Sequence, residues 1–201
     1  MASLLEIVKN LFKPRPVKLV GDALYAACVA QSRLPRFYLD YGVEDAIGAR
    51  FELLTLHVVM VVTALKSGID TALKPQADDT SQALFDAFLL ALDTTLREQG
   101  TGDLTVPKKM KTIGTVVYTR LGRWDELWKD VADRETQAAY LAATVFAGGE
   151  SDEGEVATVA VLDRARALAD YVADARAALS AAELLAGRAE WPEPADSRAA
   201  A

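Results

Sequence analysis

Apolar residues recur three or four positions apart along almost the whole chain, and this spacing limits the possible folds more than any other feature of the sequence. Such spacing places apolar side chains on one face of an α-helix, whereas a strand needs alternation with a period of two. Residues 115–119 are rich in the β-branched and aromatic residues that favour strands, but helical spacing continues on both sides of them. The sequence therefore predicts an all-α protein, a single-domain bundle of about seven or eight helices.

Prolines and glycines mark where the expected helices begin and end. We expect helices over about residues 3–13, 17–31, 45–66, 81–99, 107–123, 125–146 and 155–185, with a break in the last near Ser180. The expected boundary residues are the N-cap Thr80, the first helical residue Pro107, and the C-terminal glycines Gly100 and Gly187. Residues 69–79 and 148–155 are expected as loops.

The chain is expected to form one domain with two short appendages. Its 201 residues suit a single domain of ordinary size. We assign residues 1–16 to an amphipathic N-terminal segment, 17–187 to the helical domain, and 188–201 to a frayed C-terminal tail. The N-terminal segment has an apolar stripe and separate lysines, so it fits either packing on the domain or lying on a membrane surface.

Composition and charge exclude two classes of protein. Hydrophobic residues make up 51% of the chain, which indicates a folded protein with a sizeable core and argues against disorder. The net charge of −7 argues against a DNA-binding protein. The charge is uneven, however. Residues 1–123 carry 15 basic and 13 acidic side chains, whereas residues 124–201 carry 7 and 16, so a nearly neutral body precedes an acidic C-terminal third.

The sequence predicts a cytoplasmic protein without a membrane-spanning helix. The most apolar run, residues 51–65, is shorter than the roughly 20 residues that a spanning helix needs, and it contains four polar residues: Glu52, Thr55, His57 and Thr63. The N-terminus lacks the features of a secretory signal, and its first arginine is Arg15, unlike a mitochondrial transit peptide. The single cysteine, Cys28, excludes an internal disulfide and fits a reducing compartment.

No motif in the sequence indicates catalysis, a metal site or a cofactor. A di-iron site needs a glutamate three residues before a histidine, but the residue three before His57 is Leu54. Cys28 and His57 are a formal nucleophile and base. Cys28 lies among alanines on an expected helix, so we expect it to pack as a small apolar residue. We expect His57 to be hydrogen-bonded and partly buried, and the protein not to be an enzyme.

A basic segment follows the glycines at 100 and 102. No acid occurs between Asp103 and Asp125, and this stretch carries Lys108, Lys109, Lys111, Arg120 and Arg123. We expect Asp103 to cap the helix that follows it. The buried stripe of that helix is expected to comprise Met110, Ile113, Gly114, Val117 and Leu121, with the five basic residues on its exposed half. That half is either a plain solvated surface or a dock for anionic lipid, RNA or an acidic partner.

An ordered series of short blocks resembles a known family. The blocks include Arg36-Phe-Tyr, Tyr41-Gly-Val-Glu-Asp, Gly48-Ala-Arg-Phe-Glu-Leu-Leu-Thr-Leu-His57, Asp93-x-x-Leu-Arg-Glu98, Gly100-x-Gly-Asp-Leu104, Tyr118-x-Arg120 and Trp191-Pro192. Over residues 34–192 the series is similar to the ubiquinol–cytochrome c chaperone family. The matching positions singled out are Tyr41, Gly42, Arg50, Phe51, Glu52, His57, Asp93, Arg97, Gly100, Gly102, Asp103, Leu104 and Tyr118.

The resemblance implies a function without a catalytic site. Members of the family are helical, non-enzymatic assembly factors for respiratory complex III, and the best-known ones act on newly made cytochrome b. In mitochondria they work with a small partner protein near the ribosomal exit tunnel. The resemblance therefore implies a chaperone with no cofactor. Because the N-terminus is unlike a transit peptide, we expect a bacterial member, peripheral at the cytoplasmic face of the inner membrane. The alternative is a membrane-associated helical adaptor for another client or for anionic lipid. Thr119 and Thr101 depart from residues usual in the family.

Overall fold

The computed structural model describes residues 16–67, 69–130, 132–147 and 158–195, and all regular structure within them is helical. The predicted all-α fold is therefore confirmed. The helices are α2 (Pro16–Ser32), α3 (Pro35–Leu39), α4 (Ile47–Lys66), α5 (Lys74–Glu98), α6 (Val106–Leu127), α7 (Arg134–Thr144), α8 (Val159–Ala178) and α9 (Ala181–Leu185). The expected helix over residues 3–13 and the expected loop over 148–155 lie outside the described residues.

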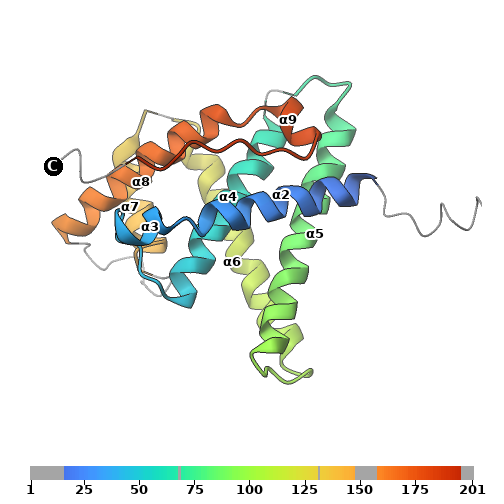
Figure 1. Cartoon of the computed structure of the whole chain (residues 1–201), viewed down its shortest axis with the longest axis horizontal. Helices are drawn as coiled ribbons and strands as arrows, with labels where there is room; N and C mark the ends of the chain where they lie inside the picture. Colours follow the sequence, from blue (N-terminus) through green and yellow to red (C-terminus); the bar gives the residue numbers. More distant parts are fainter. Residues whose placement is uncertain (1–15, 68, 131, 148–157, 196–201) are drawn as a thin grey trace, which may run out of the picture.

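Helix α4 lies at the centre of the bundle, in contact with α2, α5, α6, α8 and α9 (Figure 1). Its side chains contribute to two buried clusters. Leu53 and Met60 belong to the cluster shared with α7 and α8, whereas Val58 and Val61 belong to the cluster shared with α2 and α5. Leu53, Val58 and Val61 are buried, while Leu54 is only partly buried. A helix buried on both sides must be apolar on nearly its whole circumference.

The length and composition of α4 would suffice to cross a membrane, unlike those of the shorter run over residues 51–65. Its 20 residues include an apolar window of mean hydropathy 1.6, of which 67% is buried inside the molecule. The core helix of a water-exposed domain has these same properties.

Helices α2 and α5 cross at very close range because α2 has a glycine at the crossing. A Cβ atom at Gly21 would lie 2.5 Å from the carbonyl carbon of Ala83 and 2.7 Å from its Cβ. The nearest obstacle is backbone, which cannot rotate away as a side chain can. Gly21 therefore fixes the distance between the two helices.

Helix α5 begins earlier than the sequence indicates. Residues 74–79 are helical, with Pro75 in the first turn, where its missing N–H costs nothing. Thr80 lies inside the helix, and its hydroxyl donates to the carbonyl of Gln76 at 2.8 Å. The prediction of a loop over 69–79 ending at an N-cap on Thr80 was wrong over residues 74–80, because a proline in the first turn starts a helix as readily as it stops one.

The boundary between α6 and α7 also differs from the prediction. Helix α6 continues to Leu127, and the helical structure is interrupted between Leu127 and Arg134 instead of after Arg123. The Asp133 side chain then caps α7 by accepting the N–H of Thr136 at 3.0 Å. The predicted breaks near Ser180, at Gly100 and at Gly187 are confirmed, and both glycines have φ of +79°.

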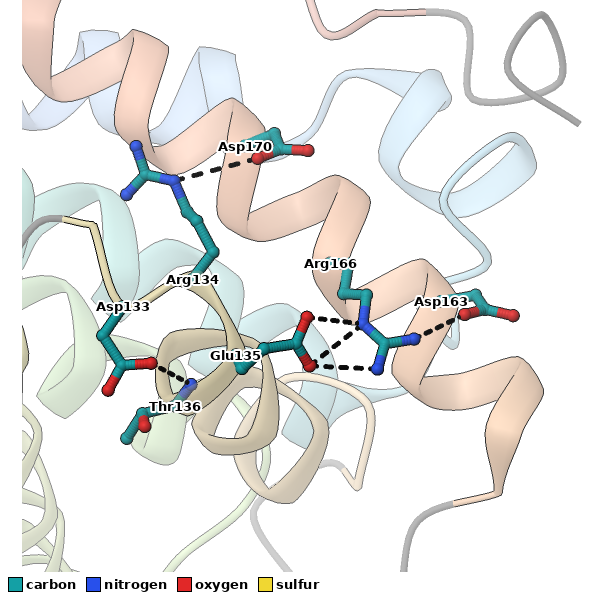
Figure 2. Close-up of polar contacts among 7 residues, drawn as sticks. All are labelled: Asp133, Arg134, Glu135, Thr136, Asp163, Arg166 and Asp170. Carbon is teal, nitrogen blue, oxygen red and sulfur yellow. Dashed lines mark hydrogen bonds and ion pairs between the residues drawn. The ribbon is translucent and has the colours of Figure 1, made fainter.

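Exposed ion pairs run between α7 and α8 (Figure 2). The Arg166 guanidinium, on α8, binds Glu135 of α7 at 2.9 Å and Asp163 of its own helix at 2.7 Å. Arg134 approaches Asp170 at 3.8 Å. Because water screens charges in the open, these contacts contribute little to stability, and the apolar surface between the two helices holds them together.

The segment after α9 is packed over residues 188–195, and the prediction of a frayed tail is wrong there. The Trp191 ring lies edge-on to His57 with centroids 5.0 Å apart. Gln31 Nε2 donates to the carbonyl of Pro192 at 3.1 Å, and Arg36 Nη1 donates to that of Pro194 at 2.9 Å. Figure 1 shows the segment running back from α9 along α8.

Candidate functional site

The distal halves of α5 and α6 form a hairpin that extends away from the other helices (Figure 1). Arg97 holds the connecting loop in place, since its guanidinium binds Asp93 at 2.7 Å and Asp103 at 2.6 Å. Gly100 supplies the left-handed turn that ends α5. Below, "the hairpin tip" means residues 97–111.

Asp103 is not the helix cap that the sequence predicts. Thr105 occupies the N-cap position of α6, and no side chain accepts a hydrogen bond there. The Asp103 carboxylate is instead paired with Arg97, six residues earlier. A full positive charge attracts a carboxylate more strongly than the partial charge of a helix end, which explains the difference.

The hairpin tip presents positive charge beside an exposed apolar side chain. Lys108, Lys109 and Lys111 are all exposed on the first turns of α6. Lys109 Nζ reaches the hydroxyl of Thr101 at 3.3 Å. Leu104 is 98% exposed. A leucine this open beside three lysines matches the mixture of apolar and cationic groups found on surfaces that bind anionic membranes or acidic proteins.

Arg120 does not belong to this basic surface, which corrects the sequence-based expectation. Its side chain is only 17% exposed, and its guanidinium makes two 2.8 Å hydrogen bonds to the buried Glu52 carboxylate of α4. These bonds raise the pKa of Arg120. The guanidinium also lies 5.8 Å from the centroid of the Tyr140 ring. Arg120 therefore ties α6 to α4 and α7 inside the domain.

Arg123 is exposed but distant from the lysines. It lies 12 residues beyond Lys111 on α6, which corresponds to roughly 18 Å along the helix axis. Its guanidinium is 5.9 Å from the ring centroid of Tyr140, near the end of α6. The five predicted basic residues thus divide into three at the hairpin tip, one in the interior and one at the far end of α6.

The stripe of α6 that faces the domain is less deeply buried than predicted. Val117 is fully buried, but Met110, Ile113, Gly114 and Leu121 are only partly covered. Among the described helices, α4 and α5 make the main contacts with α6, and only α5 accompanies its N-terminal half out into the hairpin. Trp124 and Trp128 are buried and stack with centroids 4.8 Å apart, so both are core residues.

The positions that carry the family resemblance serve two different purposes. Three of them are buried: Tyr41, Glu52 and His57. Phe51 is partly buried, and Arg50 pairs with Asp45 at 2.5 Å. Gly42 has φ of +68° and lies beside Arg164. These six belong to the framework around α3 and α4. The remaining seven lie on the α5–α6 hairpin: Asp93, Arg97, Gly100, Gly102, Asp103, Leu104 and Tyr118.

His57 is buried in a chain of hydrogen bonds. Its Nδ1 donates to the Leu53 carbonyl at 2.8 Å, so its Nε2 accepts from the Tyr171 hydroxyl at 2.9 Å. Gln31 donates to that hydroxyl at 3.0 Å. Burial lowers the pKa of His57 to about 4, so the ring is neutral. The sequence predicted a hydrogen-bonded histidine, but not that its partner would be Tyr171 of α8 or that Gln31 of α2 would bond to Tyr171 in turn.

The Cys28–His57 pair has no catalytic geometry. Both ring nitrogens of His57 already have partners, so neither is available to take a proton from a thiol. Cys28 is fully buried, and burial raises the pKa of its thiol. Among the residues that the structure describes, no group of three or more His, Cys, Asp or Glu is placed to share a metal ion.

The buried Glu52–Arg120 pair was not predicted, although the sequence held a signal for it. Glu52 stands in the most apolar run of the chain, and a buried carboxylate requires a positively charged or hydrogen-bonding partner. The choice of Arg120, 68 residues away, required the fold.

The model of one protein family, described as ubiquinol–cytochrome C chaperone, matches residues 39–191. The chain belongs to this family. A search of curated proteins finds no match. Among solved structures, the Cbp3 homolog from Brucella abortus is similar with a TM-score of 0.71 and 26% sequence identity, over 95% of this chain and 97% of that one.

The family match covers the α5–α6 hairpin and the packed residues up to Trp191, and it leaves out α2. The expectation raised by the motif blocks is therefore confirmed at the level of the family. The α5–α6 hairpin carries seven of the motif positions, and its tip is the candidate functional site of this ubiquinol–cytochrome c chaperone family member.

Proposed function

We propose that the protein is a non-enzymatic assembly chaperone for ubiquinol–cytochrome c reductase, respiratory complex III, and that it binds newly made cytochrome b at the membrane surface. The observation that carries this proposal is the family match over residues 39–191. The proposed location is the cytoplasmic face of the inner membrane. A small partner protein and the ribosome are further candidate contacts.

The hairpin tip supports a role at an anionic surface. Each basic residue near such a surface contributes about 1 kcal/mol of attraction, so three adjacent lysines suffice for reversible binding. Leu104 can enter the headgroup region while the lysines remain with the phosphates. A chaperone bound to the membrane surface through its hairpin tip is close to the apolar segments of newly made cytochrome b. Binding of this kind requires no catalytic site.

Deletion of the gene tests the proposed function. Assembled complex III and spectroscopically detected cytochrome b should fall while the cytochrome b transcript stays at its normal level, and a plasmid copy of the gene should restore both. Normal complex III in the deletion strain would contradict the proposal and favour a helical adaptor for another client.

A charge reversal tests the role of the hairpin tip. Lys108→Glu with Lys109→Glu and Lys111→Glu should reduce co-sedimentation with vesicles of phosphatidylglycerol and phosphatidylcholine, and the reduction should shrink as salt rises, because exposed charges are screened over about 8 Å at physiological ionic strength. The matched control reverses three exposed lysines elsewhere, Lys18, Lys74 and Lys129, with the same change in net charge. Equal losses in both variants would contradict a specific role for the tip.

A further inference from the structure

A hollow of about 250 Å³ opens between α4, α5 and α6, separate from the three lysines of the hairpin tip. Val62, Phe85, Tyr118 and Leu121 supply apolar surface to it. The rings of Phe85 and Tyr118 lie 5.3 Å apart, and Tyr118 is 63% exposed. A large aromatic side chain left this open beside a hollow resembles the energetically dominant contacts of protein interfaces.

The hollow also contains a buried polar group without a partner. Ser81 lines it, is only 6% exposed, and has no hydrogen-bond partner for its hydroxyl among the described residues. Its neighbour Thr80, by contrast, bonds to the carbonyl of Gln76. Leaving a buried hydroxyl unpaired is unfavourable, so a rotation of the Ser81 side chain that brings its covered hydroxyl to a polar atom in the hollow would be favourable.

A second hollow continues the first along α6. Tyr118 lines both, and the second is completed by Lys111, Gly114, Thr115 and Thr119. Nothing lies within 4 Å of the position that a Cβ on Gly114 would occupy. The small side chains of this stretch allow another helix to approach α6 closely. We refer to the two hollows together as the Tyr118 groove.

The charges around the Tyr118 groove are mainly positive. Exposed Lys66 borders it at the end of α4 and exposed Lys111 borders it on α6. Residues 104–124, which include the groove-lining part of α6, contain no acid, and Asp78 is the acidic residue among those lining the groove. A partner segment that lies along α6 is therefore best matched by acidic side chains.

We propose that the Tyr118 groove is a docking site for an acidic amphipathic helix of a partner protein, which inserts a tyrosine side chain between Phe85 and Tyr118 with its hydroxyl at Ser81. A tyrosine meets both requirements of the hollow, because its ring matches the apolar walls and its hydroxyl can pair with the serine. The proposal goes beyond the proposed function, since it depends neither on cytochrome b as client nor on an anionic membrane.

Binding of a designed peptide tests the site. The probe is a side-chain-stapled, fluorescein-labelled helix of about 18 residues with a central tyrosine, leucines on the same face and glutamates at the flanks, measured by fluorescence anisotropy with the full chain. We expect saturable binding below about 1 mM and at least a tenfold weaker affinity for Tyr118→Ala. The matched control, Leu19→Ala, removes another exposed apolar side chain and should bind like wild type. No saturable binding, or equal losses in both variants, would overturn the proposal.

A double-mutant cycle tests the contact with Ser81. Replacing the peptide's tyrosine by phenylalanine should weaken binding to wild type about three- to tenfold, as expected for one hydrogen bond. The same replacement should have no effect on binding to Ser81→Ala, whose fold is safe because the hydroxyl has no partner to lose. Independent effects of the two changes would refute the serine contact.

Two further measurements separate the groove from the hairpin tip. Lys66→Glu, which lies outside the hairpin tip, should weaken the peptide's binding, and replacing the peptide's glutamates by glutamines should remove this dependence. Tyr118→Ala should leave vesicle co-sedimentation unchanged. A loss of vesicle binding in Tyr118→Ala would mean that the groove takes lipid instead, and would overturn the proposal of a protein partner without affecting the proposed function.

Discussion

Helix α5 joins two regions that are built in opposite ways. Near its beginning it crosses α2 so closely that Gly21 has no room for a single added carbon. At its other end the hairpin tip exposes 98% of Leu104, and a Cβ added at Gly100 or Gly102 would meet nothing within 4 Å. Close packing against α2 fixes the first half of α5 in the bundle. At the hairpin tip, exposed side chains remain available for contacts with other molecules.

The treatment of charge differs between the two regions as well. Inside the bundle, Glu52 and Arg120 satisfy each other, and His57 is neutral between Leu53 and Tyr171. At the hairpin tip the charges face water, where Arg97 and two carboxylates hold the loop and the lysines remain exposed. The comparison teaches that substitutions in the bundle should change stability, whereas substitutions at the tip should change binding alone.

The largest contrast is expected between two leucines. Leu53→Ala should lower the free energy of unfolding by about 2–5 kcal/mol, because it leaves a cavity in a fully buried site on α4. Leu104→Ala should change it by less than about 0.5 kcal/mol, because that side chain is already in water. Urea unfolding of both variants measures the difference. Similar values for the two would mean that α4 is not the core of the domain.

A pair of glycines gives the next largest contrast. Gly21→Ala should destabilise the protein by about 3 kcal/mol, because its Cβ would push against the backbone of Ala83. Gly122→Ala, in the open on α6, should stabilise it by about 0.5–1 kcal/mol through better helix propensity. Thermal melting of the two variants checks both signs. A stabilising Gly21→Ala would show that α2 and α5 are not held at this distance.

The neutral state of His57 predicts a dependence of stability on pH. In the unfolded chain a histidine binds its proton below about pH 6.5, whereas burial lowers the pKa of His57 in the folded protein to about 4. Stability should therefore be complete well above pH 6.5 and fall as the pH drops toward 4, by roughly 2.5 kcal/mol at pH 4.5.

The control for this prediction is His57→Gln, which retains a polar side chain but cannot titrate. Carboxylates titrate in both proteins, so the difference between their unfolding free energies as a function of pH isolates the histidine. If the two curves stay parallel between pH 6.5 and 4.5, His57 is not held neutral by burial.

The smallest effect on stability is expected at the hairpin tip. The triple reversal of Lys108, Lys109 and Lys111 to glutamate should change the free energy of unfolding by less than about 0.5 kcal/mol, because all three side chains are exposed and acids near the start of a helix are tolerated well. Chemical unfolding measures this directly. A strongly destabilised variant would show that the lysines support the fold, and its loss of vesicle binding would no longer indicate a docking surface.

Local signals predicted most helix ends correctly, and the errors have a common cause. Gly100, Ser180 and Gly187 end helices as expected because a left-handed glycine or an extended serine interrupts a helix whatever surrounds it. The start of α5 at Pro75 and the boundary between α6 and α7 were predicted wrongly. A proline fits both the end of one helix and the first turn of the next, and the choice depends on which apolar face finds a neighbour.

The sequence by itself determined the helical class, the central apolar helix and the family, because periodicity, hydropathy and ordered motif blocks are local properties of the chain. Only the tertiary structure separated Arg120 from the exposed lysines. An arginine on the polar face of an amphipathic helix gives the same sequence pattern whether its guanidinium is in water or is paired with Glu52. The tertiary structure likewise ordered residues 188–195, whose partners Gln31, Arg36 and His57 lie more than a hundred positions earlier. Pairing over such distances depends on how the helices pack, and no window of the sequence contains both partners.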